Sequence, residues 1–196
     1  GGTNSTKKEE DQIKTVRIDQ ILETYQEFQL FYREILIDNI VDHVQLKYKI
    51  SLDDITKQTN ILDKAYKNVE STDKKVDAKI KEIDKKIDNA LSKECTFERK
   101  DFIDIADQIT NSIPKSVNLT SLDDAEKRAV KFRDSIESAL KENGTEVTNE
   151  ITQGVNTIVS KYANLLKFQI QIENKCLTEM NKIFSILYKE ISKAAK

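Results

Sequence analysis

The two cysteines, Cys95 and Cys176, are the residues with the most distinctive chemistry in this chain. Metal centres and thiol–disulfide enzymes use closely spaced cysteines or nearby histidines, and neither arrangement is present here. We instead predict a structural disulfide between Cys95 and Cys176, which would stabilise the fold by about 4 to 5 kcal/mol in the chain-entropy model. The alternative is a cytosolic protein with two unbridged thiols.

The single histidine, His43, offers no catalytic or metal-binding arrangement. On a helix its neighbours four residues away are Asn39 and Lys47, which do not complete a metal site. The acidic pairs at 53–54 and 123–124 stand at expected helix starts, where capping and the helix dipole account for them. The sequence also lacks a glycine-rich phosphate loop and EF-hand spacing. We therefore predict no catalytic residues, no metal and no cofactor, and a protein that is not an enzyme.

Three N-x-S/T sequons begin at Asn4, Asn118 and Asn143. Asn118 and Asn143 fall in the two stretches that are most typical of loops, where a glycan can be attached. Together with the expected disulfide, the sequons favour a secreted, extracellular glycoprotein.

The charge pattern argues against a nucleic-acid partner. The 32 basic and 34 acidic residues nearly cancel, leaving a net charge of −2. Almost all of the basic residues are lysine, and the arginines are scattered rather than clustered as phosphate-binding surfaces require. No apolar run approaches the roughly 18 residues that span a bilayer, so we expect no transmembrane segment, and no signal peptide is recognisable.

The scarcity of helix breakers predicts the architecture. From Lys7 onward the chain has one proline, Pro114, and two glycines, Gly144 and Gly154. Apolar residues recur three and four positions apart, which is the helical period. Charged residues make up 34% of the chain and apolar ones only 38%, a balance that suits slender bundles of helices with much exposed surface. We predict an all-α protein.

The pattern divides into about five helices. The second of them carries a heptad seam from Ile55 to Ala90, and the second and fourth open with the same Ser-Leu-Asp-Asp capping sequence. Thr96 and Thr145 are the expected N-caps of the third and fifth helices. The expected helices are 9–47, 51–93, 97–111, 121–142 and 146–194.

Similar lengths predict how these helices assemble. The first, second and last are each about 60 to 70 Å long, and the third and fourth match them end to end. We expect an elongated antiparallel bundle of four limbs, with the third limb broken near Pro114. Cys95 lies at the junction of the second and third helices. In this register Cys176, on the last helix, lies within a few turns of it. Residues 9–196 would form a single domain, and 1–8 a disordered tail.

One stretch of the last helix is a candidate ligand contact. Between Leu166 and Leu177 the seam positions are polar, whereas Phe168, Ile170 and Ile172 flank them. These aromatic and aliphatic side chains are more typical of a core, but they could also line an apolar cavity.

Three functions remain open at this point. The first is a secreted, non-enzymatic protein that binds a macromolecular partner, as surface antigens, adhesins and host-modulating factors do. The second is an extracellular carrier of a lipid or other apolar ligand. The third is a membrane-active helical toxin. One observation argues against this function: no pair of the expected helices is apolar enough to insert into a bilayer. The partner itself is unknown, and the chain would be a monomer or a weak homo-oligomer.

Overall fold

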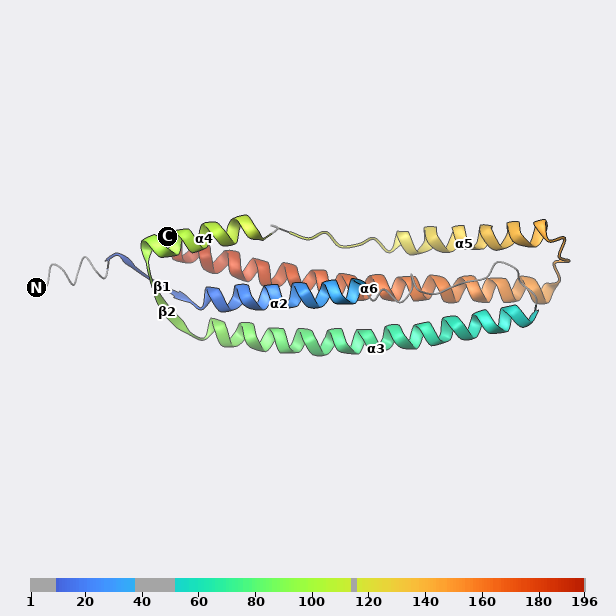
Figure 1. Ribbon diagram of the computed structural model, residues 1–196, viewed down its shortest axis with the longest axis horizontal. Coiled ribbons are helices and arrows are strands. Elements are labelled where there is room, and N and C mark those ends of the chain that lie inside the picture. Colours follow the sequence, from blue (N-terminus) through green and yellow to red (C-terminus); the bar gives the residue numbers. More distant parts are fainter. Residues whose placement is uncertain (1–9, 38–51, 114–115, 196) are drawn as a thin grey trace, which may run out of the picture. The chain divides into compact units, whose positions relative to one another are not determined.

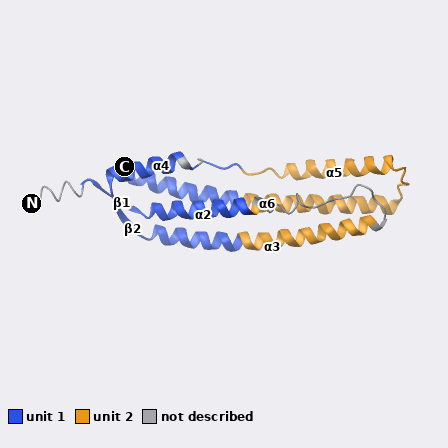
Figure 2. Ribbon diagram, in the orientation of Figure 1, with its two compact units in different colours: residues 1–34, 77–118, 176–196 blue, residues 35–76, 119–175 orange. Residues whose placement is uncertain are grey.

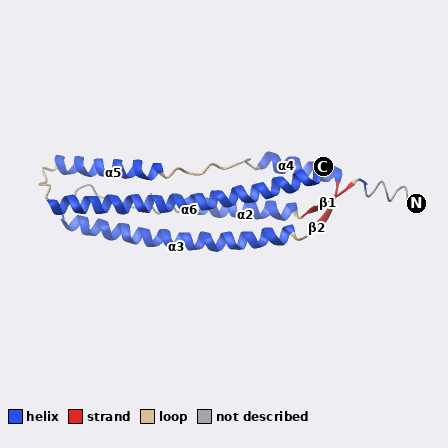
Figure 3. Ribbon diagram, turned by 180° about the vertical axis from the view of Figure 1, so that it is seen from behind, coloured by secondary structure: helices blue, strands red, loops and turns tan. Residues whose placement is uncertain are grey.

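The computed structural model describes residues 10–37, 52–113 and 116–195, and within them it is mostly helical (Figures 1 and 3). The all-α class is confirmed. Asn4, His43, Ser51 and Pro114 lie outside the described residues. The elements, in chain order, are β1 (Gln12–Val16), α2 (Ile18–Ile37), α3 (Leu52–Leu91), β2 (Glu94–Glu98), α4 (Arg99–Ser112), α5 (Asp123–Glu142) and α6 (Asn149–Ala195).

The chain divides into two compact units, which Figure 2 shows in different colours. Unit 1 comprises residues 1–34, 77–118 and 176–196, and unit 2 comprises 35–76 and 119–175. Unit 1 therefore contains β1, β2, α4, nearly all of α2 and the C-terminal parts of α3 and α6. Unit 2 contains α5 and the N-terminal parts of α3 and α6. The expected single domain stays a prediction.

One of the two sets of positions in the heptad seam predicted for the second helix is confirmed by burial in α3. Leu62 and every seventh residue after it, as far as Ala90, are at most 1% exposed. The companion positions of the seam are less covered, and Tyr66 among them is 39% exposed. α3 therefore buries one narrow stripe and leaves the rest of its charged surface in solvent, as a two-sevenths apolar pattern requires.

In unit 1 the first expected helix begins too early, because Gln12–Val16 is a strand. It pairs antiparallel with Glu94–Glu98, so that Ile13 lies opposite Phe97 and Thr15 opposite Cys95. Ile13 and Thr15 are buried while their neighbours in the strand are more exposed, which is the alternation of a half-buried strand.

The second strand also changes the start of the helix that follows it. Thr96, the expected N-cap, lies inside β2, and α4 begins at Arg99 rather than 97. The residue before α4, Glu98, makes no side-chain capping bond. Instead, the Arg99 N–H donates a 2.7 Å hydrogen bond to the Asp11 carbonyl, just before β1. The backbone just before β1 thus satisfies one of the N–H groups that the first turn of α4 leaves without a partner inside the helix.

The structure does not support the predicted disulfide, because the two cysteines lie at different levels of unit 1. α3 and α6 run in the same direction there (Figure 1), and Asp84 of α3 pairs with Lys182 of α6. Cys176 comes six residues before Lys182, about 9 Å back along the helix, whereas Cys95 comes eleven residues after Asp84. Cys95 is thus displaced one way from this pair and Cys176 the other.

In unit 2 the residues between α5 and α6 include both the C-cap of α5 and the N-cap of α6. Gly144 has a φ of 62°, and the Thr145 N–H donates to the Leu140 carbonyl, which is a glycine-based C-cap. This C-cap confirms that the helix ends at Asn143-Gly144, as predicted. It also uses the N–H group of Thr145, so Thr145 belongs to the end of α5 and is not the N-cap of α6. The N-cap of α6 is Thr148 instead, whose hydroxyl accepts a 3.2 Å hydrogen bond from the Ile151 N–H.

The connection from α4 to α5 is held by two asparagines of α6, seven residues apart. In unit 1 the Asn181 side chain accepts a bond from the Val117 N–H and donates one to the Val117 carbonyl, both 2.8 Å long. In unit 2 Asn174 makes the same pair of bonds to Thr120, at 2.7 and 2.9 Å. Each side-chain amide thus pairs with both the backbone N–H and the backbone C=O group of one residue, as a neighbouring strand would.

Gly154 permits a close contact between α6 and α3 in unit 2. A Cβ atom at this position would lie 2.7 Å from both the Cδ1 and the Cγ2 atoms of Ile55. Because two branches of one side chain are in the way, a single rotamer change does not make room.

We expect Gly154→Ala to lower the free energy of unfolding by about 1 kcal/mol, because overpacking by 1–3 kcal/mol outweighs the roughly 1 kcal/mol gained in helix propensity. In an Ile55→Ala background the same change should stabilise the protein, since the obstructing methyl groups are gone. Urea unfolding of the four proteins measures both effects. Equal effects in the two backgrounds would contradict the close packing.

Candidate functional site

A groove of about 430 Å³ lies on unit 2, between α3 and α6. Its residues recur three or four positions apart on each helix, so one face of each helix forms one wall. We call it the aromatic groove. It is lined by Leu62, Asp63, Tyr66, Lys161, Asn164, Lys167, Phe168 and Gln171.

Tyr66 and Phe168 form the apolar part of this groove. Their rings stack with centroids 5.3 Å apart and planes inclined by 29°. Tyr66 remains 39% exposed, and Phe168 is half-buried. The two rings stabilise one another by their contact, and Tyr66 still exposes part of its side chain to an incoming molecule.

Polar side chains surround the two rings. The Lys161 ammonium group pairs with the Asp63 carboxylate at 2.5 Å, and Lys167 lies 3.4 Å from Glu126 of α5. These pairs are partly or largely exposed, so each adds little to stability. Asn164 and Gln171 are exposed amides that can donate and accept hydrogen bonds. The groove thus combines a small apolar centre with a polar rim.

Only one of the three predicted apolar contacts lies in this groove. Phe168 lines it, whereas Ile170 lines a separate groove of about 360 Å³ beside α5, and Ile172 is buried at 2% exposure. Residues two apart on a helix point about 200° apart, so Phe168 and Ile170 cannot share one wall. The role of these residues as ligand contacts stays a prediction.

Sequence reasoning assigned Tyr66 to the buried seam and so missed its place in the groove. The signal was available in the residue type, because a tyrosine in a seam position carries a hydroxyl group that needs water or a partner. A seam position occupied by tyrosine therefore lies at the edge of the buried stripe more readily than one occupied by leucine.

The two described sequons are accessible. Asn118 is exposed in the segment between α4 and α5, and Asn143 is exposed in the turn after α5. Asn4 lies outside the described residues. Both described positions are therefore open to a modifying enzyme, and their glycosylation stays a prediction.

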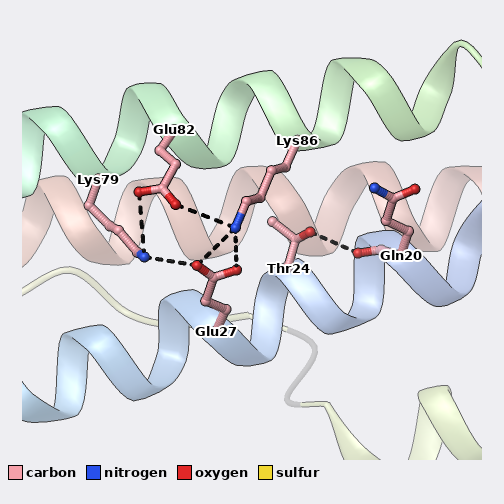
Figure 4. Close-up of polar contacts among 6 residues, drawn as sticks. All are labelled: Gln20, Thr24, Glu27, Lys79, Glu82 and Lys86. Atoms are coloured by element: carbon pink, nitrogen blue, oxygen red, sulfur yellow. Dashed lines mark hydrogen bonds and ion pairs between the residues drawn. The ribbon is translucent and has the colours of Figure 1, made fainter.

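Figure 4 shows a charged cluster on unit 1, in which Glu27 of α2 reaches two lysines of α3. The Glu27 carboxylate accepts hydrogen bonds from Lys79 at 2.8 Å and from Lys86 at 2.9 Å, and Glu82 lies within reach of both lysines. The hydrogen bonds from Lys79 and Lys86 lower the pKa of Glu27. Lys79 also lies over the ring of Phe31, 5.7 Å from its centroid.

A second cluster in unit 1 has more carboxyl groups than ammonium groups. Glu179 of α6 is only 6% exposed, and its Oε2 atom lies 3.1 Å from the Lys182 ammonium group. Lys182 also pairs with Asp84 of α3. Burial raises the pKa of Glu179 to about 7, the neighbouring Asp84 carboxylate adds to the rise, and Lys182 opposes it.

Within 10–37, 52–113 and 116–195, no three histidine, cysteine or acidic side chains gather as metal ligands would. In the same ranges, none of the helices has the length and hydropathy needed to cross a bilayer. The Cys95 thiol, half-buried in β2, has a pKa raised by burial, which makes it a poorer nucleophile.

Comparison with protein-family models, with curated proteins and with solved structures gave no significant match. Function must therefore be argued from the residues themselves.

We expect Glu27→Gln to cost no more than about 1 kcal/mol at pH 7, because the cluster is partly exposed to solvent. The folded-state pKa of Glu27 is lowered, so its contribution is present at neutral pH and is lost as the pH falls through the acid range. The difference in melting temperature between wild type and variant should therefore be smaller at pH 3 than at pH 7.

Glu23, an exposed residue one turn earlier on α2, provides the control. Glu23→Gln should leave the melting temperature almost unchanged at both pH values. A Glu27→Gln difference that is the same at pH 3 and pH 7 would show that the ion pairs with Lys79 and Lys86 do not stabilise the protein.

Proposed function

We propose that this protein acts by binding a macromolecular partner outside the cell, and that the aromatic groove is the contact site. The observation that carries the proposal is the exposed Tyr66 stacked on Phe168 inside a polar rim. Binding sites between proteins concentrate their energy in such aromatic residues, surrounded by polar groups that exclude water. We also propose that the helices assemble into the elongated antiparallel bundle of four limbs that the sequence predicts.

The lining of the groove favours a protein partner over a lipid. Five of its eight lining residues are lysine, aspartate, asparagine or glutamine. A lipid carrier needs an enclosed cavity lined mainly by apolar side chains, because each polar group left without a partner beside an acyl chain costs free energy. A partner protein can instead place an apolar anchor on the rings and polar groups against Lys161, Asn164 and Gln171.

Removing the ring pair tests the proposal. We expect the tagged full chain to capture a partner from a preparation of cell-surface and plasma proteins. The Tyr66→Ala/Phe168→Ala double variant should lose at least nine-tenths of that capture. Asn164→Arg, which fills the groove from an exposed position, should have the same effect without disturbing the stacked rings. Circular dichroism of each variant confirms that the helices are retained.

The chain provides a matched control in unit 1. Phe184 and Tyr188 of α6 also stack, with centroids 6.2 Å apart, and Tyr188 is 59% exposed. Phe184→Ala/Tyr188→Ala removes an equivalent pair of rings from outside the groove, and capture should persist. Equal capture by the wild type and both groove variants would refute the proposed contact site. An acyl lipid found by solvent extraction and mass spectrometry would support the carrier instead.

A further inference from the structure

Glu179 occupies an unusual position in unit 1, because it is a buried carboxyl group with only part of its hydrogen-bonding capacity used. Its Oε2 atom meets Lys182, but no donor from the described residues reaches its Oε1 atom. The Asp84 carboxyl group is close enough to exchange a hydrogen bond with Glu179 when one of the two carries a proton. Two carboxyl groups therefore face one ammonium group, and the cluster is electrically balanced only when one proton is shared.

The partners of Glu179 lie nearer to solvent than Glu179 itself. The side chains of Asp84 and Lys182 are 40% and 46% exposed, whereas that of Glu179 is 7% exposed. Water can therefore solvate the charges of Asp84 and Lys182 but not a charge on Glu179. Ionisation of Glu179 would place an uncompensated negative charge in the contact between α3 and α6.

We propose that Asp84, Glu179 and Lys182 form a pH-sensitive latch between α3 and α6 in unit 1, closed while the two carboxyl groups share a proton and weakened when that proton leaves. We call this cluster the carboxyl latch.

The carboxyl latch consists of these three residues, because the other charged groups of unit 1 are not among those that act on Glu179. Among the described residues, the charges that act on Glu179 come from Asp84 of α3 and Lys182 of α6. All charged side chains of α4 are exposed, and those of α2 are exposed except Glu27, which Lys79 and Lys86 already engage. The buried Tyr25 of α2 stays neutral near pH 7, because burial raises its pKa further. The remaining charged residues of α3 and α6 in unit 1 are Asp77, Lys79, Lys81, Glu82, Lys85, Lys86, Asp88, Lys189, Glu190 and Lys193.

The sign of the pH dependence follows from proton linkage. The folded chain keeps a proton on Glu179 up to about pH 7, whereas an unfolded chain releases it near pH 4.3. The latch therefore contributes in full below the unfolded value and loses its contribution as the pH rises toward 7 and beyond. Asp84 works in the other direction. Burial tends to raise its pKa, but the hydrogen bonds from Glu179 and Lys182 outweigh this and lower it.

Cys176 offers a local reporter of the latch. It lies three residues before Glu179 on α6, and it is completely buried. A thiol reagent can reach it only when this part of unit 1 opens. In a Cys95→Ser background, the labelling rate divided by that of the urea-unfolded chain at the same pH reports the opening alone, because the ionisation of the thiol cancels.

We expect this ratio to rise at least tenfold between pH 5 and pH 8.5 in the Cys95→Ser protein. Glu179→Gln, which keeps the size and removes the charge, should make the ratio nearly independent of pH. Glu137→Gln, a change at an exposed position of α5, should leave the rise unaltered. Asp84→Asn leaves Lys182 to Glu179 alone, so the midpoint of the rise should move to lower pH.

Two outcomes would overturn the latch. One is a pH profile of Glu179→Gln parallel to that of its parent protein. The other is a profile of Asp84→Asn with an unchanged midpoint, which would mean that the two carboxyl groups do not share a proton. Neither result depends on whether the aromatic groove binds a partner.

Discussion

The apolar stripe of α6 is the constraint on which the described structure depends. It runs from Ile151 to Leu187 without a glycine or proline after Gly154, and its buried members belong to both compact units. Three polar side chains of this helix that are not exposed have specific partners. Asn174 and Asn181 hold the backbone between α4 and α5, and Glu179 meets Asp84.

How much of this could be predicted depends on how local the signal is. The heptad of α3 and the cap at Gly144 are set by residues within one or two turns, and both were predicted. The strands were not, because β1 and β2 are short and their partners are far apart in sequence. The alternation of Ile13 and Thr15 is present in the sequence, but so short a pattern does not distinguish a strand from the first turns of a helix. Thr145 was misassigned as a cap because its N–H group closes the preceding helix.

The functional residues were harder to predict than the helices, because they depend on register. A shift of a few turns between two helices separates Cys95 from Cys176, and length matching alone does not resolve such a shift. Of the residues that line the aromatic groove, only Phe168 was singled out as a candidate, because its partner Tyr66 lies on a helix about a hundred residues earlier. Glu179 carries no signal in the sequence, because a glutamate in a helix of a lysine-rich chain is ordinary until its neighbours are known.

The two glutamate clusters of unit 1 show what decides the behaviour of a carboxyl group in such a chain. Glu27 accepts hydrogen bonds from two lysines, Lys79 and Lys86, which it shares with the exposed Glu82, so its charged form is favoured and its pKa falls. Glu179 shares a single lysine with Asp84 and is more deeply buried, so its neutral form is favoured and its pKa rises. The local ratio of ammonium to carboxyl groups, combined with burial, therefore sets the direction of the pKa shift. The net charge of −2 does not reveal this direction. Glu27 stabilises unit 1 once it is ionised and Glu179 while it is protonated, so these two clusters together favour a stability maximum on the acidic side of neutrality.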